Sequence, residues 1–194
     1  MRLKRITIFC GSSSGTDSRF EQMAFDLGRN MANRGIGLVY GGAKIGLMGA
    51  VANGALSEGG EVIGVLPNFL SRKEILQEGL SELIMVDTMH ERKALMDKLS
   101  DGAIALPGGY GTLEELLEML TWSQLGLHGK PLGLFNMNGF YDDLLHLFDK
   151  MIVSGFLKQC NKDLLLVHSD FLQLLDLIEN YETPDLVGKW IEKN

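Results

Sequence analysis

The sequence has few of the features that mark specialised protein classes. It contains two cysteines, Cys10 and Cys160, and their wide separation suggests neither a disulfide framework nor a metal site. Cys10 ends an apolar run and is expected to be a small buried residue rather than a nucleophile. The longest stretch without Lys, Arg, Asp or Glu, residues 45–57, is too short and too rich in glycine to span a bilayer. We therefore expect no membrane association.

An excess of positive charge is also missing. Lysine and arginine number 18 against 25 acidic residues, which gives a formal net charge of −7. This balance argues against a general nucleic-acid binder, because such proteins normally present a basic face. It leaves small anions open, since the backbone amides of one loop can bind a phosphate in an acidic protein. The N-terminal apolar run lacks the cleavage pattern of a signal peptide, so we expect a first strand there and a cytoplasmic protein.

The chain shows no internal repeat, low-complexity tract or linker, and its length fits a single domain over residues 1–194. Short runs of Val, Ile and Leu alternate with helical patterns. Unbroken runs are typical of strands buried on both faces of a parallel sheet. The pattern therefore predicts an α/β fold: a doubly wound, Rossmann-like open parallel sheet of about seven strands with helices on both faces. The expected strands are residues 5–10, 37–40, 61–66, 82–86, 102–106, 131–135 and 163–167, and the expected helices are residues 17–34, 46–58, 91–99, 112–125, 141–154 and 170–180.

Glycine is abundant, at 24 residues, and three clusters directly follow expected strands. They are GSSSG at 11–15, GGAKIGLMG at 41–49 and PGGYG at 107–111. In an open parallel sheet such loops lie at the carboxyl edge, where ligands bind near the topological switch point. A helix then begins at each loop, so unpaired amides and a partial positive charge face one crevice, which favours a phosphate or another anion. One cluster alone would be read as a turn, whereas three at one edge favour a binding site, with Gly11 and Ser12 as contacts from the first loop.

Two familiar nucleotide fingerprints are incomplete in these loops. Residues 41–46 begin like a P-loop, but Leu47 stands where the lysine is required. Residues 109–114 begin like a dinucleotide fingerprint, but Glu114 replaces the third glycine, which normally permits close packing of helix and strand. We therefore favour a mononucleotide over ATP or a dinucleotide.

Thr112 and Glu115 have the spacing of a capping box, with Thr112 as the N-cap and Glu115 at the third helical position. Such a box can serve stability alone. The same placement also predicts a carboxylate that stays ionised, held by the helix dipole and the amides. Near the sugar of a nucleotide whose phosphate lies on residues 109–111, it would stabilise an oxocarbenium-like transition state and orient water. Glu114 points elsewhere on the helix and is a secondary contact.

The segment MHERKALM, residues 89–96, starts a helix after the fourth expected strand. Arg92 and Lys93 are adjacent and so face different directions. They form either a solvated face with an Arg–Glu pair, or a site in which the Arg92 guanidinium pairs with Glu115 or donates to a leaving base. The spacing does not decide between these two interpretations.

Taken together, these motifs resemble the Lonely Guy (LOG) family, cytokinin-activating phosphoribohydrolases that are often mislabelled as lysine decarboxylases. The matching segments are GSSSG, YGGAKIGLMGAVANGAL, MHERKALM, PGGYGTLEE and TWSQLGLHGKP, in one unbroken order over residues 5–181. The resemblance implies hydrolysis of the N-glycosidic bond of adenine-type nucleoside 5′-monophosphates to the free base and ribose 5-phosphate. It implies no cofactor, no essential metal, and a homodimer with the site near the interface.

The resemblance also assigns residues. Arg92 and Glu115 match the family's catalytic positions. The substrate-contacting positions are matched by Glu74, Arg92, Lys93, Gly109, Tyr110, Gly111, Thr112, Leu113, Glu114, Glu115 and Thr121. Glu74 and Thr121 rest on the match alone. The match does not say whether the base carries an N6 prenyl group or is plain adenine.

Two other functions are weighed against this one. A non-catalytic nucleotide or cofactor carrier, similar to molybdenum-cofactor carrier proteins, would keep the glycine loops without needing the pair of Arg92 and Glu115. A pyridoxal-phosphate-dependent lysine decarboxylase would need a Schiff-base lysine with a partner for the ring nitrogen, and no lysine here has that context. Lys44, where some family members have serine, either adds charge to the crevice or points to solvent.

Overall fold

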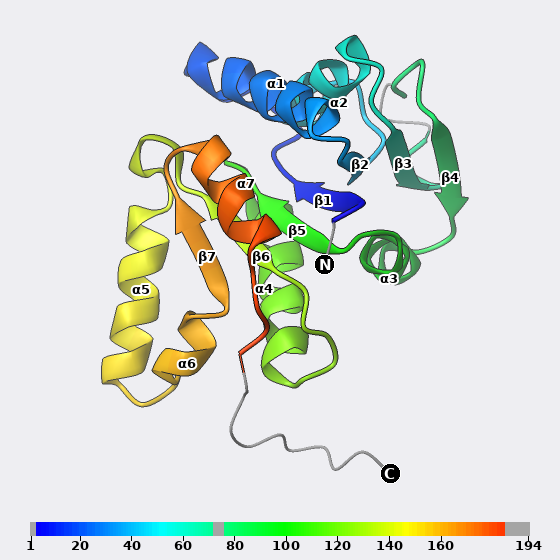
Figure 1. The fold of residues 1–194 in the computed structure, drawn as a ribbon. Coiled ribbons are helices and arrows are strands. Elements are labelled where there is room, and N and C mark those ends of the chain that lie inside the picture. Colours follow the sequence, from blue (N-terminus) through cyan, green and yellow to red (C-terminus); the bar gives the residue numbers. More distant parts are fainter. Residues whose placement is uncertain (1–2, 72–75, 185–194) are drawn as a thin grey trace.

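The computed structural model describes residues 3–71 and 76–184, and within them seven strands form one sheet (Figure 1). The strand order is β4-β3-β2-β1-β5-β6-β7, and every pair of neighbouring strands is parallel. Buried runs of Val, Ile and Leu make up the central strands, as expected for strands covered on both faces. The strands are β1 (Arg5–Phe9), β2 (Gly37–Tyr40), β3 (Val62–Pro67), β4 (Glu82–Val86), β5 (Gly102–Ala105), β6 (Leu132–Phe135) and β7 (Leu165–His168).

The order reverses beside β1. From β1 the chain moves outward to β4, then crosses back to β5 and moves outward again to β7. Ile6 of β1 is therefore paired with Leu38 on one side and with Gly102 on the other. At this switch point the loops that leave β1 and β5 diverge, which opens a crevice at the carboxyl edge of the sheet.

Helices cover both faces of the sheet (Figure 1). One buried cluster joins β1 and β2 to α1, α2 and α7, and a second joins β3, β5 and β6 to α3, α4 and α5. The predicted doubly wound α/β fold is therefore confirmed. The helices are α1 (Ser18–Asn33), α2 (Gly46–Ser57), α3 (Met89–Leu99), α4 (Tyr110–Gln124), α5 (Asp142–Val153), α6 (Gln159–Lys162) and α7 (Phe171–Glu179), with a short 3₁₀ turn at Met137–Gly139.

The helices α1 and α2 touch each other through backbone. A Cβ atom added at Gly54 would lie 1.9 Å from the Phe25 carbonyl oxygen, and one at Gly28 would lie 2.0 Å from the Val51 carbonyl oxygen. No side chain larger than hydrogen fits at either position, so these glycines set the distance between the two helices. On this face the core is closed by direct contact.

The expected elements differ from the observed ones mainly at their ends. Most bounds agree within two residues, while α6 and the 3₁₀ turn were not predicted because both are too short to show a period. Within the described residues, no helix combines the length and the hydrophobicity needed to cross a membrane.

Candidate active site

The three glycine loops meet at one cavity, as predicted. The Gly11 amide donates to the Pro107 carbonyl at 3.0 Å, and the Leu47 amide donates to the Gly11 carbonyl at 3.1 Å, so hydrogen bonds tie the loops together. The cavity between them has a volume of about 330 Å³. Most of the candidate residues line it: Gly11, Ser12, Arg92, Gly109, Tyr110, Gly111, Thr112, Glu114 and Glu115.

The start of α4 differs from the predicted capping box. The helix begins at Tyr110, two residues before the expected N-cap, and its N-cap is Gly109, which supplies no capping side chain. Thr112 lies inside the first turn, buried against Gly108, where an added Cβ would lie 2.1 Å from its hydroxyl oxygen. Within the described residues, the amides of Tyr110, Gly111 and Thr112 donate to no protein group. These amides and the positive end of the helix dipole are therefore free to bind an anion.

Glu115 lies one turn into α4, on the cavity wall, and is mostly buried. Burial raises the pKa of its carboxyl group to about 7, while the nearby Arg92 and Lys93 oppose this rise and Glu114 and Glu118 add to it. The expectation of a carboxylate kept ionised by the helix start is therefore wrong. Because the helix begins earlier, Glu115 is too far along it to reach the free amides, and desolvation dominates. A group that titrates near neutrality is suited to chemistry at that pH.

Arg92 projects from α3 into the same cavity and is only 9% exposed. Its Nε donates to the Val65 carbonyl oxygen at 3.1 Å, at the end of β3. A Cβ at Gly41 would lie 2.1 Å from the guanidinium, so glycine at this position makes room for the arginine. The solvated-face interpretation is thus excluded for Arg92. Among the described residues no ion pair joins Arg92 to Glu115, although Arg92 is close enough to lower the pKa of that carboxyl group.

Lys93 is not among the residues that line the cavity, although Glu114, which it contacts, is. Lys93 is 8% exposed. Its Nζ donates a hydrogen bond to Glu114 Oε1 and lies 2.9 Å from Glu118 Oε2, and both carboxylates are on α4. Burial would lower the pKa of the ammonium group, but the two carboxylates outweigh it and raise the pKa. Lys93 therefore bridges α3 and α4.

Two other candidates do not line the cavity, and a third cannot be placed. Leu113, on α4, is partly buried and packs against the core. Thr121 is exposed, donates its hydroxyl to the Leu117 carbonyl at 2.7 Å, and lines a separate groove between α4 and α5. Glu74 lies outside the described residues. Lys44 is exposed and is not among the residues that line the cavity.

The sequence reasoning missed the apolar half of the cavity. Met48, Met89 and Met96 line it beside Ile8 and Phe9 at the end of β1. In the sequence, the one feature that pointed to these methionines was their position, since each lies in or near a glycine loop or the Arg-Lys pair. Polarizable thioethers can contact the flat face of a heterocycle, so this wall is suited to a base. Cys10, also on the wall, is buried, and burial raises the pKa of its thiol, as expected of a structural residue.

A second cavity of about 340 Å³ adjoins the first, and the two share Gly11, Ser12 and Gly109. Its apolar walls include Phe20 and Phe140, whose rings meet edge to face with centroids 5.8 Å apart. A ligand held at the start of α4 therefore has room on both sides.

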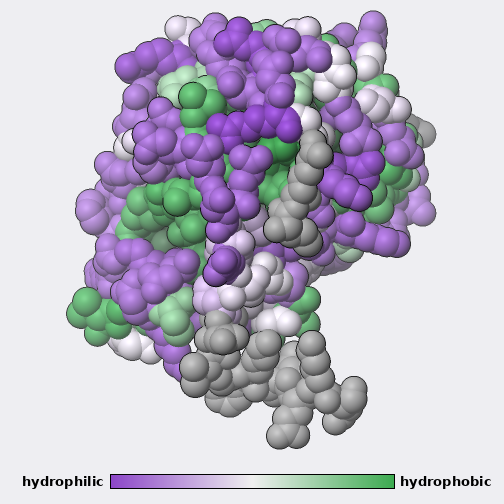
Figure 2. Space-filling view, in the orientation of Figure 1, coloured by the Kyte–Doolittle hydropathy of each residue, from purple (hydrophilic) through white to green (hydrophobic). Residues whose placement is uncertain are grey.

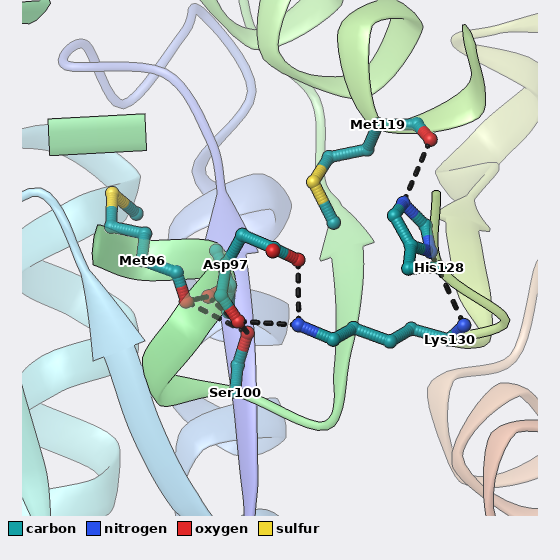
Figure 3. A network of polar contacts seen from close by, with 7 residues as sticks. Met96, Asp97, Ser100, Met119, His128 and Lys130 are labelled. Atoms are coloured by element: carbon teal, nitrogen blue, oxygen red, sulfur yellow. Dashed lines mark hydrogen bonds and ion pairs between the residues drawn. The ribbon is translucent and has the colours of Figure 1, made fainter. Parts of the chain in front are cut away.

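A polar network connects the C-terminal halves of α3 and α4 (Figure 3). Lys130, in the loop before β6, donates to Asp97 Oδ1 of α3 at 2.6 Å. The Lys130 amide donates to His128 Nδ1 at 3.2 Å, and His128 Nε2 lies 3.1 Å from the Met119 carbonyl oxygen of α4. Burial lowers the pKa of His128, which fits a neutral ring that accepts at Nδ1 and donates at Nε2.

Comparison with known proteins shows strong similarity at the sequence level. The family model described as "Possible lysine decarboxylase" matches residues 48–178. Cytokinin riboside 5′-monophosphate phosphoribohydrolase LOG2 of Arabidopsis thaliana is 45% identical over 195 residues, which cover 100% of this chain and 92% of the relative. Probable cytokinin riboside 5′-monophosphate phosphoribohydrolase LOGL1 of Oryza sativa subsp. japonica is 49% identical over 180 residues, covering 93% of this chain and 81% of the relative.

Solved structures with the same fold are more distant in sequence. The molybdenum cofactor binding protein of Rippkaea orientalis is 25% identical with a TM-score of 0.67, and the alignment covers 92% of this chain and 96% of that one. The molybdenum cofactor carrier protein of Chlamydomonas reinhardtii is 22% identical with a TM-score of 0.67, covering 90% and 99%. The structural-genomics target TM1055 is 22% identical with a TM-score of 0.71, covering 92% and 99%.

Proposed function

The chain belongs to the LOG family of cytokinin riboside 5′-monophosphate phosphoribohydrolases, and on that premise we propose that it hydrolyses the N-glycosidic bond of adenine-type nucleoside 5′-monophosphates. The products are the free base and ribose 5-phosphate. One observation carries the proposal: a helix start without a cap and a mostly buried carboxylate beside an arginine face the same cavity. The first suits the phosphate and the second suits the bond to the base.

The phosphate is proposed to lie on the free amides of Tyr110, Gly111 and Thr112. Anions at a helix start are stabilised by these donors and by the dipole, with no need for a lysine. Gly109 and Gly111 have no heavy atom within 4 Å of an added Cβ, so a ligand can approach the backbone closely there. Tyr110, 94% exposed at the rim, is free to turn its ring toward the bound sugar or base.

Glu115 and Arg92 are proposed to act on the sugar and the base. The carboxylate form of Glu115 stabilises positive charge that develops at C1′ and orients the attacking water. Arg92 keeps part of the Glu115 population ionised and donates a hydrogen bond to the departing base. The base is proposed to lie against the side chains of Met48, Met89 and Met96, which exclude water from it.

AMP and its N6-prenylated form are both proposed as substrates. The adjoining cavity supports an apolar extension of the ligand, because Phe20, Leu47 and Phe140 form part of its wall and no charged side chain is among the described residues that line it. The relative turnover of the two nucleotides ranks them.

We also propose that the chain works as a homodimer with the site near the interface. Support comes from apolar surface on α4 and α5: Leu117 and Leu147 line the groove that also contains Thr121. At the C-terminal end of α5, Val153 is 89% exposed and Phe156 is 88% exposed, and Figure 2 shows hydrophobic colour at that corner. Apolar patches of this kind mark interaction surfaces. Light scattering of the purified protein should give twice the chain mass of 21.4 kDa.

The activity is tested by mixing the purified protein with AMP or isopentenyl-AMP and measuring free base and ribose 5-phosphate. Release of both products is expected, and Glu115→Gln should reduce the rate by about a thousandfold, a typical effect of removing a group that stabilises developing charge. No base release from either nucleotide, with a wild type indistinguishable from Glu115→Gln, would sink the proposal. Tight nucleotide binding with no turnover would favour the carrier function.

A further inference from the structure

Next to Arg92 and Glu115 lie two ion pairs, from Lys93 to Glu114 and to Glu118, that have no role in the proposed chemistry. Lys93 follows Arg92 on α3, and Glu114 precedes Glu115 on α4. Lys93 is buried and holds both Glu114 and Glu118, so an ion bridge stands directly beside the two groups assigned to catalysis. Lys93 is absent from the residues that line the cavity.

We propose that Lys93 is a positioning residue, which ties α3 to α4 through Glu114 and Glu118 and thereby sets the placement and charge environment of Glu115 relative to Arg92. This inference rests on the proposed function. It departs from the substrate contact that the resemblance assigned to Lys93, since the Lys93 ammonium is engaged by two carboxylates on α4 and is absent from the cavity lining. Freeing the buried ammonium would leave it without the two carboxylates that offset its desolvation.

The bridge has an electrostatic consequence for Glu115. The charged groups that face this carboxyl group are Arg92 and Lys93 from α3 and Glu114 and Glu118 from α4. On the β1 side lies the Cys10 thiol, whose own pKa is raised by burial and by Glu115. Without Lys93, Arg92 alone among these four groups would oppose the two carboxylates, and the ionised form of Glu115 would be less favoured.

Two substitutions should therefore move the titration of Glu115 in opposite directions. Lys93→Met keeps the aliphatic stem and removes the cation, so the pKa of Glu115 rises. Glu118→Gln removes one of the opposing carboxylates, so the pKa of Glu115 falls. A purely structural defect would not produce opposite shifts, and the second variant keeps the test valid if the first folds poorly.

The experiment uses the full chain and two readouts. The first is the Glu115 carboxyl titration in the free protein, followed by carbon-detected NMR and assigned with Glu115→Gln. The second is the pH profile of kcat and KM with AMP. For Lys93→Met we expect a titration shifted up by about one unit, the same shift in the acid limb of kcat, and a plateau kcat lowered about tenfold with KM within about threefold. Adding Glu118→Gln to Lys93→Met should reverse part of the shift.

The control is Lys98→Met, which removes an exposed lysine from the same helix and should leave both readouts unchanged. A rise in KM of tenfold or more with an unmoved Glu115 titration would overturn the inference and make Lys93 a substrate contact. The titration needs no turnover. A wild type that releases no base would therefore defeat the proposed function, while the opposite shifts would still decide the role of Lys93.

Discussion

An apolar cluster covers each face of the sheet, but neighbouring helices on the two faces contact each other in different ways. On one face, α1 and α2 meet backbone to backbone, with Gly28 and Gly54 leaving no room for any side chain. On the other face, long charged side chains connect α3 to its surroundings: Lys93 reaches Glu114 and Glu118 on α4, and Asp97 holds Lys130. We call the first the closed face and the second the bridged face. Ile8, Cys10 and Met48 of the first cluster line part of the cavity, but Arg92 and Glu115 both come from helices of the bridged face.

This difference separates stability from chemistry. Backbone contact is short-ranged and excludes water, so it suits a face that only has to hold the sheet together. An ion bridge spans a gap, and it brings charges that change the pKa of any carboxyl group nearby. Arg92 and Glu115, which are assigned to the chemical step, both lie on helices of the bridged face.

Breaking the closed face should have the largest effect on stability. Gly54→Val would place side-chain atoms into the Phe25 carbonyl, whose oxygen lies 1.9 Å from an added Cβ. The helices must separate, and we expect a loss of about 4 kcal/mol or a failure to fold. Urea unfolding of the variant measures this loss. Ala94→Val, at an exposed position of α3, is the control and should cost about 0.5 kcal/mol. Equal midpoints for the two variants would mean that α1 and α2 are not held by this contact.

On the bridged face, a substitution should increase the stability of the protein, because the buried carboxyl group of Glu115 lowers that stability when it is ionised. The folded pKa of Glu115 is about 7, above its ordinary value of 4.5, so the folded state binds the proton more tightly between these values. Above pH 7 the folded chain carries an unfavourable charge, and stability falls as the pH rises through this window. Glu115→Gln removes that cost, and we expect it to stabilise the protein at pH 8 by up to about 3 kcal/mol more than at pH 4.5.

Urea unfolding at the two pH values measures this difference, with Glu58→Gln at the exposed end of α2 as the matched control. The control should keep the pH dependence of the wild type. If Glu115→Gln is no more stabilising at pH 8 than at pH 4.5, the carboxyl group is solvated and its pKa in the folded protein is close to the ordinary value of 4.5.

Much of this architecture was accessible from the sequence. The unbroken apolar runs predicted all seven strands, because burial on both faces removes the alternation that other strands show. The glycine loops predicted the cavity edge, since the carboxyl ends of parallel strands share one edge. Both inferences depend on local patterns, and local patterns are what a single sequence displays.

The start of α4 and the burial of Lys93 depend on distant residues instead. Thr112 and Glu115 match a capping box in the sequence. In the structure Thr112 packs against Gly108, and α4 begins at Tyr110, before the predicted N-cap. The spacing left Lys93 either on a solvated face or at the site, because the carboxylates that allow its burial, Glu114 and Glu118, lie more than twenty residues away. A charged residue can be buried only where its partner is brought to it, which the fold decides.

The smallest effect is expected at the outer bridge of the same face (Figure 3). Lys130 and Asp97 are each 23% exposed, so water screens their attraction, and Lys130→Met should cost about 1 kcal/mol. The His128 ring stays in place, since it accepts from the Lys130 backbone amide and not from the side chain. Asp97 lies near the end of α3 away from the cavity, so kcat should change by no more than about threefold. A double-mutant cycle of Lys130→Met and Asp97→Asn, measured by urea unfolding and by turnover of AMP, separates the free energy of the ion pair from the contribution of each side chain alone. If the coupling free energy between Lys130 and Asp97 is as large as the loss of stability in Gly54→Val, ion pairs stabilise this face as much as the glycine contacts stabilise the other.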